Sequence, residues 1–155
     1  MSRAFVKESE DAASELELPE RSISQHRNLV TPTGLERIEA EVRQLEEQLA
    51  TARAADDKPA IARCQRDLRY WTQRRATAEV VPPPTRRDKV RFGSTVVVRL
   101  DGGAEKTLRI VGEDEANPTD GLVAYVAPVA AQMIGAAVGE RVDTGGAEGE
   151  IIVIR

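Results

Sequence analysis

Aromatic residues and cysteines are scarce in this chain, and both shortages exclude classes of protein. Only 3% of the 155 residues are aromatic, so the core must consist mainly of Val, Ile, Leu and Ala. The single cysteine, Cys64, lies in an apolar helical stripe, which argues against a disulfide framework or a metal site. No apolar run approaches the length of a membrane span, and residues 1–29 contain no signal-peptide core. We therefore expect a cytoplasmic protein without membrane contact.

A general excess of positive charge is lacking as well. The net charge of −4 gives the chain no overall attraction to nucleic acid. The charges are nevertheless segregated, because residues 35–49 are mainly acidic and residues 58–75 mainly basic. This segregation favours pairing of the two segments and leaves surplus arginines for an acidic partner or for phosphates.

Apolar residues recur at alternating intervals of three and four in two neighbouring segments. The first set is Leu35, Ile38, Val42, Leu45, Leu49 and Ala52, and the second is Ile61, Cys64, Leu68 and Trp71. The spacing predicts a helix over residues 32–54 and a second helix that ends near residue 78. Because the connecting turn is short, the two helices should fold back as an antiparallel coiled coil. Thr31 should cap the first helix, with Pro32 at its first position.

Three consecutive prolines, residues 82–84, end the helical part, and strand patterns follow them. Strands are expected over residues 90–100, 107–111, 122–126, 141–144 and 150–154, with a short helix from Pro128 to about residue 134. The predicted fold class is α+β: an N-terminal antiparallel helical hairpin and a C-terminal antiparallel sheet with one short helix. The predicted divisions are a flexible arm (1–29), the hairpin (30–81), a proline-rich hinge (82–87) and a C-terminal domain (88–155).

Several stretches, in order, resemble the bacterial GreA/GreB transcription elongation factors, which stimulate transcript cleavage. They are Val-Thr-Pro-Thr-Gly-Leu at 30–35, Leu-Arg-Tyr-Trp at 68–71, Phe-Gly-Ser-Thr-Val at 92–96, Leu-Arg-Ile-Val-Gly-Glu-Asp-Glu at 108–115, and residues 127–135. The resemblance implies an FKBP-like C-terminal domain that docks on bacterial RNA polymerase at its secondary channel, with the hairpin inserted into the channel. It also implies contact with nascent RNA or DNA in the complex. We expect a monomer that is not itself an enzyme, has no cofactor of its own and assists the polymerase's own cleavage reaction.

The hairpin tip departs from the family. An Asp-x-x-Glu-Asn-Ala-x-Tyr pattern on longer arms is replaced here by Ala55-Asp56-Asp57-Lys58 on short arms, as in the regulator of nucleoside diphosphate kinase. The resemblance makes Asp56 and Asp57 candidates for holding a Mg²⁺ ion shared with the polymerase, since Mg²⁺ prefers oxygen ligands. The alternative is that they cap the second helix. The short arms predict weak or absent stimulation of cleavage.

Two further sets are candidate partner-binding residues. Arg63, Arg66 and Arg69 could meet the acidic polymerase channel or RNA phosphates, or they could form a solvated face paired with the first helix. Val126, Ala127 and Pro128 stand where the family has Asn/Asp-Ser-Pro, a docking segment. Two other functions stay open: a true cleavage factor that uses the tip carboxylates, and a coiled-coil adaptor that does not bind polymerase.

Overall fold

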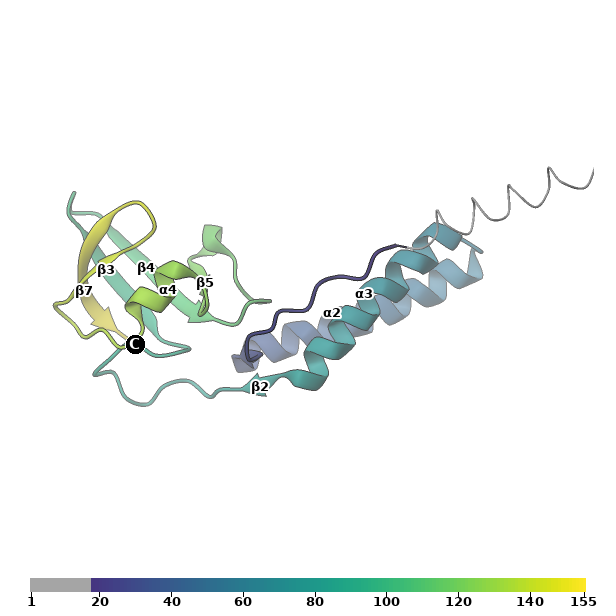
Figure 1. Ribbon diagram of the computed structural model, residues 1–155, viewed down its shortest axis with the longest axis horizontal. Helices are drawn as coiled ribbons and strands as arrows, with labels where there is room; N and C mark the ends of the chain where they lie inside the picture. The colour runs from purple at the N-terminus through teal and green to yellow at the C-terminus, as the bar shows by residue number, and fades with distance from the viewer. Residues whose placement is uncertain (1–17) are drawn as a thin grey trace, which may run out of the picture. The chain divides into compact units, whose positions relative to one another are not determined.

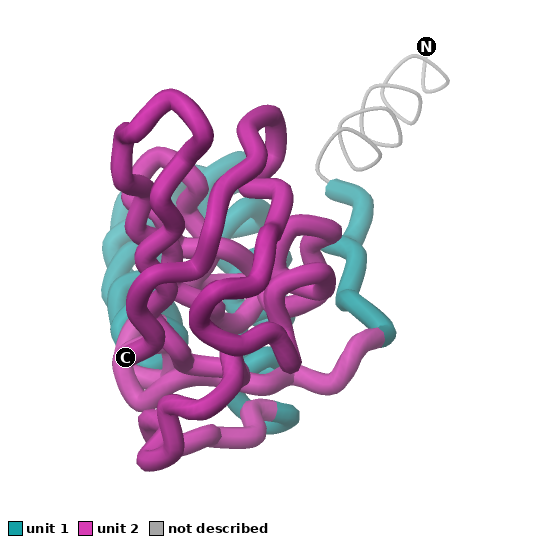
Figure 2. Tube along the Cα trace, turned by 90° about the vertical axis from the view of Figure 1, so that its left-hand side faces the viewer, with its two compact units in different colours: residues 1–25, 38–77 teal, residues 26–37, 78–155 magenta. Residues whose placement is uncertain are grey.

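The computed structural model describes residues 18–155, which fall into two compact units (Figures 1 and 2). The first unit combines the described residues up to 25 with residues 38–77, and the second combines residues 26–37 with residues 78–155. The first turn of the first helix therefore belongs to the second unit. Within the described residues, no helix is long and apolar enough to cross a membrane.

Two helices form the hairpin of the first unit. Helix α2 spans Pro32–Ala54 and helix α3 spans Lys58–Thr77, which confirms both predicted helices. The apolar stripe of α2 is buried from residue 38 onward, at Ile38, Val42, Leu45, Leu49 and Ala52. On α3 only Cys64 of the stripe is fully buried, while Ile61, Leu68 and Trp71 are half-buried. Two helices alone shield only a narrow seam, so the edges of each stripe stay partly exposed.

Residues 18–28 precede the hairpin and contain neither helix nor strand. The part in the first unit runs along α3 (Figure 1). There Glu20 binds Arg69, and Arg21 stacks on Tyr70. These contacts fall within the segment predicted as a flexible arm. Residues 1–17 of that predicted arm lie outside the described part of the chain.

A five-stranded sheet forms the second unit. Its strands are β3 (Thr95–Leu100), β4 (Glu105–Val111), β5 (Leu122–Ala124), β6 (Arg141–Asp143) and β7 (Glu148–Ile154), in the order β5-β4-β3-β7-β6. Pairs β3–β4, β3–β7 and β6–β7 are antiparallel, but β5 runs parallel to β4. The prediction of a purely antiparallel sheet is therefore wrong. Residues 112–121, including the 3₁₀ turn Pro118–Asp120, carry the chain back so that Leu122 pairs with Arg109.

The predicted strand over residues 90–100 is also too long. Gly93 has φ +85°, and the Ser94 hydroxyl accepts a hydrogen bond from the Arg91 backbone N–H at 2.9 Å. Residues 90–94 therefore form a turn, and β3 begins only at Thr95. Val90 still reaches the core, where it is 1% exposed.

The core of the second unit lies between the sheet and helix α4, which spans Pro128–Met133. The sheet contributes Val96, Val98, Leu108, Ile110, Val142, Ile151 and Ile154, and α4 contributes Ala130 and Met133. The helix ends as predicted before Gly135, whose φ is +91°. A hairpin and a sheet with one short helix confirm the α+β class.

The start of α2 is held inside the second unit. Strand β1 (Leu29–Val30) pairs in parallel with β2 (Glu79–Val80), and Thr31 follows directly as the predicted cap of α2. The Thr31 hydroxyl accepts a hydrogen bond from the Gly34 N–H at 2.9 Å and donates one to the buried carboxylate of Glu115. Both hydrogen-bonding roles of the hydroxyl are thus fulfilled away from water.

A substitution at Gly112 tests how closely β1 approaches the loop that follows β4. A Cβ atom added there would lie 2.3 Å from the Leu29 carbonyl oxygen, a backbone atom that cannot rotate away. We expect Gly112→Ala to lower the free energy of unfolding by roughly 2–3 kcal/mol, because overpacking must displace backbone. Gly102→Ala is the matched control, since nothing lies within 4 Å of a Cβ added there. This control should change the free energy of unfolding by less than about 0.5 kcal/mol. Urea denaturation measures both, and equal effects would contradict the close approach.

Candidate functional site

The hairpin tip consists of three residues between α2 and α3, and its two carboxylates have different roles. Asp57 caps α3: its Oδ1 accepts a hydrogen bond from the Ala60 N–H at 3.1 Å, and its backbone carbonyl accepts one from Ile61 at 2.9 Å. Asp56 instead has φ +50°, a left-handed conformation that only a few non-glycine residues tolerate. The cap predicted for either residue is therefore made by Asp57.

Both tip carboxylates are exposed, as delivery of a metal ion to a partner would require. Two adjacent carboxylates suit Mg²⁺ by their chemistry, although one Asp57 oxygen is already engaged in the cap. No group of three or more His, Cys, Asp or Glu side chains that could hold a metal is present among residues 18–155. A coordination shell at the tip would therefore need further oxygen ligands, from water or from a partner.

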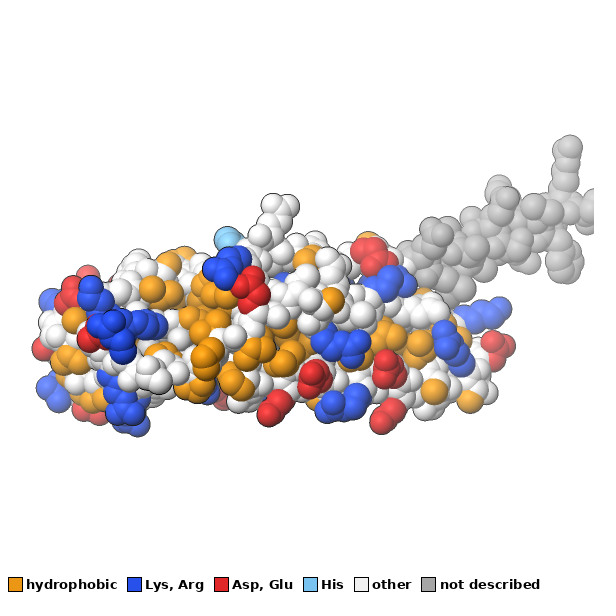
Figure 3. Space-filling model, turned by 90° about the horizontal axis from the view of Figure 1, so that it is seen from below, with side chains coloured by type: hydrophobic (Ala, Val, Ile, Leu, Met, Phe, Trp, Pro, Cys, Tyr) orange, Lys and Arg blue, Asp and Glu red, His pale blue; other side chains and the backbone are white. Residues whose placement is uncertain are grey.

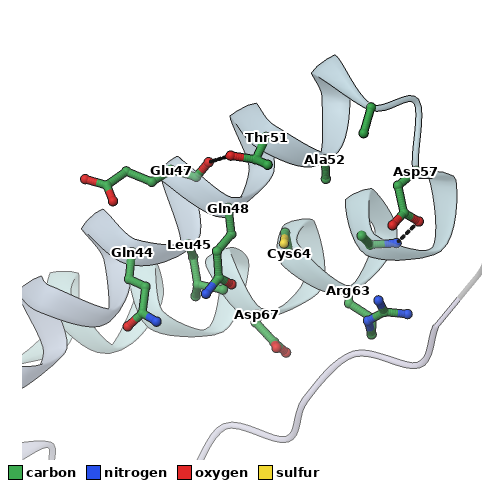
Figure 4. A pocket seen from close by; sticks show the side chains of 12 residues that line it. Gln44, Leu45, Glu47, Gln48, Thr51, Ala52, Asp57, Arg63, Cys64 and Asp67 are labelled. Atoms are coloured by element: carbon green, nitrogen blue, oxygen red, sulfur yellow. Dashed lines mark hydrogen bonds between the residues drawn. The ribbon is translucent and has the colours of Figure 1, made fainter.

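A shallow groove of about 680 Å³ lies beside the tip, between α2 and α3 (Figure 4). Leu45, Ala52 and Cys64 form its apolar part, and polar side chains surround them, including Asp57, Arg63 and Asp67. Arg63 is exposed at this groove, the nearest of the three candidate arginines to the tip along the chain. The structure thus brings Arg63 and Asp57 to one groove.

The other two candidate arginines bind carboxylates of the same chain. Arg66 donates from Nε to Asp67 Oδ1 at 2.9 Å, and Arg69 donates from Nε to both Glu20 oxygens at 3.0 and 3.1 Å. Neither of these partners belongs to the acidic α2 helix. On the face shown in Figure 3, side chains of both signs are interspersed over the hairpin. The arginines therefore do not form one continuous basic field there.

Glu20 and Arg21 were not predicted as site residues. The hydrogen bond from Arg69 lowers the pKa of Glu20 and, reciprocally, raises the pKa of Arg69. The Arg21 guanidinium lies 3.9 Å from the centre of the Tyr70 ring and 5.6 Å from that of Trp71. The partners are about fifty positions apart, so no local periodicity in residues 18–28 could indicate these contacts.

The segment Val126-Ala127-Pro128 leads into α4 in the second unit. Ala127 occupies the N-cap position without a side-chain hydrogen bond, and Pro128 is the exposed first residue of the helix. Val126 and Ala127 are half-buried. Next to them, the Tyr125 hydroxyl donates to the Arg27 carbonyl oxygen at 2.6 Å, and its ring meets Phe92 edge-on at 5.7 Å between ring centres. The segment thus presents a small, apolar surface.

Comparison with known proteins finds similarity to one family in the C-terminal part of the chain. Residues 84–154 match the family model described as transcription elongation factor, GreA/GreB, C-term. The chain is 38% identical over 79 residues to transcription elongation factor GreB of Neisseria meningitidis serogroup B, covering 50% of this chain and 48% of the relative. It is 44% identical over 72 residues to GreA of Methylobacterium sp., covering 43% and 46%. The chain thus aligns with about half the length of these relatives.

Solved structures give a second comparison. The GreA factor homolog 1 (Gfh1) of Thermus thermophilus matches 84% of this chain and 99% of its own, at 18% identity and a TM-score of 0.41. The GreA/GreB factor from Nitrosomonas europaea matches 81% and 97%, at 21% identity and a TM-score of 0.39.

The different roles of the two tip carboxylates can be separated by stability measurements. Asp57→Ala removes the α3 cap and should lower the free energy of unfolding by about 1 kcal/mol. Asp56→Gly places a residue that readily adopts positive φ at the same turn. This substitution should leave the free energy of unfolding unchanged or raise it by up to about 1 kcal/mol. Thermal or urea unfolding of the full chain measures both. Equal destabilisation by the two substitutions would refute the assignment of the cap.

Proposed function

We propose that this chain is a GreA/GreB-family factor, and that it regulates transcription elongation by binding bacterial RNA polymerase. The C-terminal domain docks at the rim of the secondary channel through Val126, Ala127 and Pro128, and the hairpin enters the channel. The observation that carries this proposal is the family match over residues 84–154, which includes the docking segment and α4. The relatives are named transcription elongation factors, which supports a regulatory role for this chain.

We infer that this regulator stimulates transcript cleavage weakly or not at all. A Mg²⁺ ion held between the tip and the polymerase would supply a Lewis acid that activates water against the RNA. Asp56 and Asp57 are the residues of this chain that would hold it, and Asp57 already shares its carboxylate with the α3 cap. Helix α2 has 23 residues and α3 has 20, so the arms are only about 30 Å long at ~1.5 Å per residue. Misplacement by about 1 Å can already cost ~10²-fold in rate.

Arg63 is the arginine best placed to meet an acidic or phosphate group of the complex. It is exposed at the groove beside the tip, whereas Arg66 and Arg69 bind Asp67 and Glu20. Contact with nascent RNA or DNA, if made by the hairpin, would use this side chain first. The apolar character of Val126 and Ala127 supports the alternative function of a polymerase-independent adaptor, because it differs from the polar docking segment implied by the family resemblance.

Binding to core RNA polymerase tests the leading function. The full-length chain should bind at micromolar concentrations or below, and Pro128→Glu should weaken binding by at least about tenfold by placing a charge at the docking segment. Val138→Glu is the matched control, since Val138 is also exposed in the second unit, at 56%, but lies outside this segment. Fluorescence anisotropy or biolayer interferometry measures both affinities. Absence of binding by the unaltered chain would favour the adaptor.

A cleavage assay separates the two kinds of polymerase-binding regulator. Backtracked elongation complexes should show little RNA shortening above that of polymerase alone, and the chain should compete with longer Gre factors. Asp56→Asn with Asp57→Asn is the informative variant, because asparagine retains the ability to cap α3 while the negative charges are removed. Robust cleavage that disappears in this variant would make the chain a true cleavage factor.

A further inference from the structure

Residues 18–25 occupy one face of α3, and we call them the strap. Glu20 makes its central contact, because its two carboxylate oxygens both accept hydrogen bonds from Arg69. Leu18, Ile23 and Ser24 of the strap are half-buried. Figure 1 shows the strap running beside α3 rather than away from it. An extended segment is thus already bound to the hairpin.

Arg21 makes the complementary contact one position later. Its guanidinium lies over the Tyr70 ring, and its Nη1 lies 3.7 Å from Asp67 Oδ1. Tyr70 and Trp71 support it as an aromatic pair, with ring centres 5.1 Å apart and planes at 86°. Aromatic faces and a carboxylate both attract a guanidinium. We call Asp67, Arg69, Tyr70 and Trp71 the strap surface.

The chemistry of the strap surface selects a particular ligand. Arg69 donates from Nε to both oxygens of a carboxylate and from Nη2 to one of them. The neighbouring Asp67 and Tyr70 bind the arginine that follows this acidic residue. The ligand must be extended, since consecutive side chains of the strap reach separate groups on one helix. A peptide with an acidic residue followed by arginine fits, whereas a peptide with acidic residues at both positions would bring a carboxylate against Asp67.

We propose that α3 carries a recognition surface for an extended acidic-residue–arginine peptide of a partner protein, and that the strap fills this surface in cis as a competitive cover. The ion pair of Glu20 and Arg69 is displaceable, because these side chains are 61% and 56% exposed and screened by solvent. The strap's advantage is its covalent attachment, which gives it a high effective concentration. One consequence rests on the proposed function: Arg69 contacts the polymerase only after the strap has detached.

A peptide supplied in trans tests the surface without any polymerase. The probe is a fluorescently labelled peptide with the sequence of residues 16–25, and the protein is the full-length chain carrying Glu20→Ala with Arg21→Ala. Opening the cover should make the peptide bind at least about tenfold more tightly than to the unaltered chain. Glu36→Ala with Arg37→Ala is the matched control: it removes the same exposed residue pair from α2 and should leave the affinity unchanged. Equal affinity for all three proteins, or no binding to any, overturns the proposal.

Exchanging the charges of Glu20 and Arg69 provides a second test. Trp71 is the only tryptophan of the chain, so its fluorescence reports on the strap surface alone. Arg69→Glu should repel Glu20, and acrylamide should then quench Trp71 more strongly, by about twofold in the quenching constant. Adding Glu20→Arg should restore quenching to the original value. An unchanged signal in Arg69→Glu, or failure of the second substitution to restore it, contradicts the proposal.

The polymerase experiment separates this inference from the proposed function. If the unaltered chain binds polymerase, Glu20→Ala with Arg21→Ala should bind more tightly than Glu36→Ala with Arg37→Ala. Equal binding by the two variants would show that the strap does not control access to α3. If no variant binds polymerase, the proposed function fails, and the peptide and quenching results still decide whether the strap surface exists.

Discussion

The buried contact between Thr31 and Glu115 is the interaction on which the second unit's arrangement depends. It joins residues 84 positions apart, and it places a carboxylate at the first turn of α2, where the helix dipole favours negative charge. A buried carboxylate without partners would be costly, so Glu115 and Thr31 must be brought together whenever this unit folds. Gly112 then allows Leu29 to approach the loop after β4, and β1 pairs with β2 beside it. These three contacts together hold the start of α2 within the second unit.

The hairpin of the first unit depends on a narrower set of contacts. One apolar seam is buried between α2 and α3, and the half-buried edges of α3 are left for other groups to cover. The strap covers one such edge with an ion pair and a stacked guanidinium, each of which contributes little alone at an exposed position. A surface held in this way can exchange partners, whereas a fully buried seam cannot. Arg63 and Arg69 lie on the same helix, but only Arg69 is covered by the strap.

The proposed function assigns a different task to each unit. The C-terminal part carries the family match, and the proposed docking segment within it presents a small apolar surface. The tip carries two exposed carboxylates, one of which also stabilises its own helix. The short arms and the shared carboxylate are the two observations behind the proposal that this chain stimulates cleavage weakly or not at all.

Local patterns in the sequence were sufficient to determine the helices. The alternating apolar spacing predicted both arms of the hairpin, and Thr31 and Pro32 predicted the start of α2. Pro128 and Gly135 predicted the two ends of α4. The residues of each such pattern lie within a few positions of one another, so the pattern can be interpreted without knowledge of tertiary contacts. The parallel pairing of β5 with β4, the Thr31–Glu115 contact and the strap on α3 were decided only in the folded structure. Each of these joins segments whose own residues are compatible with several arrangements, and only burial and complementary charge across long separations select one.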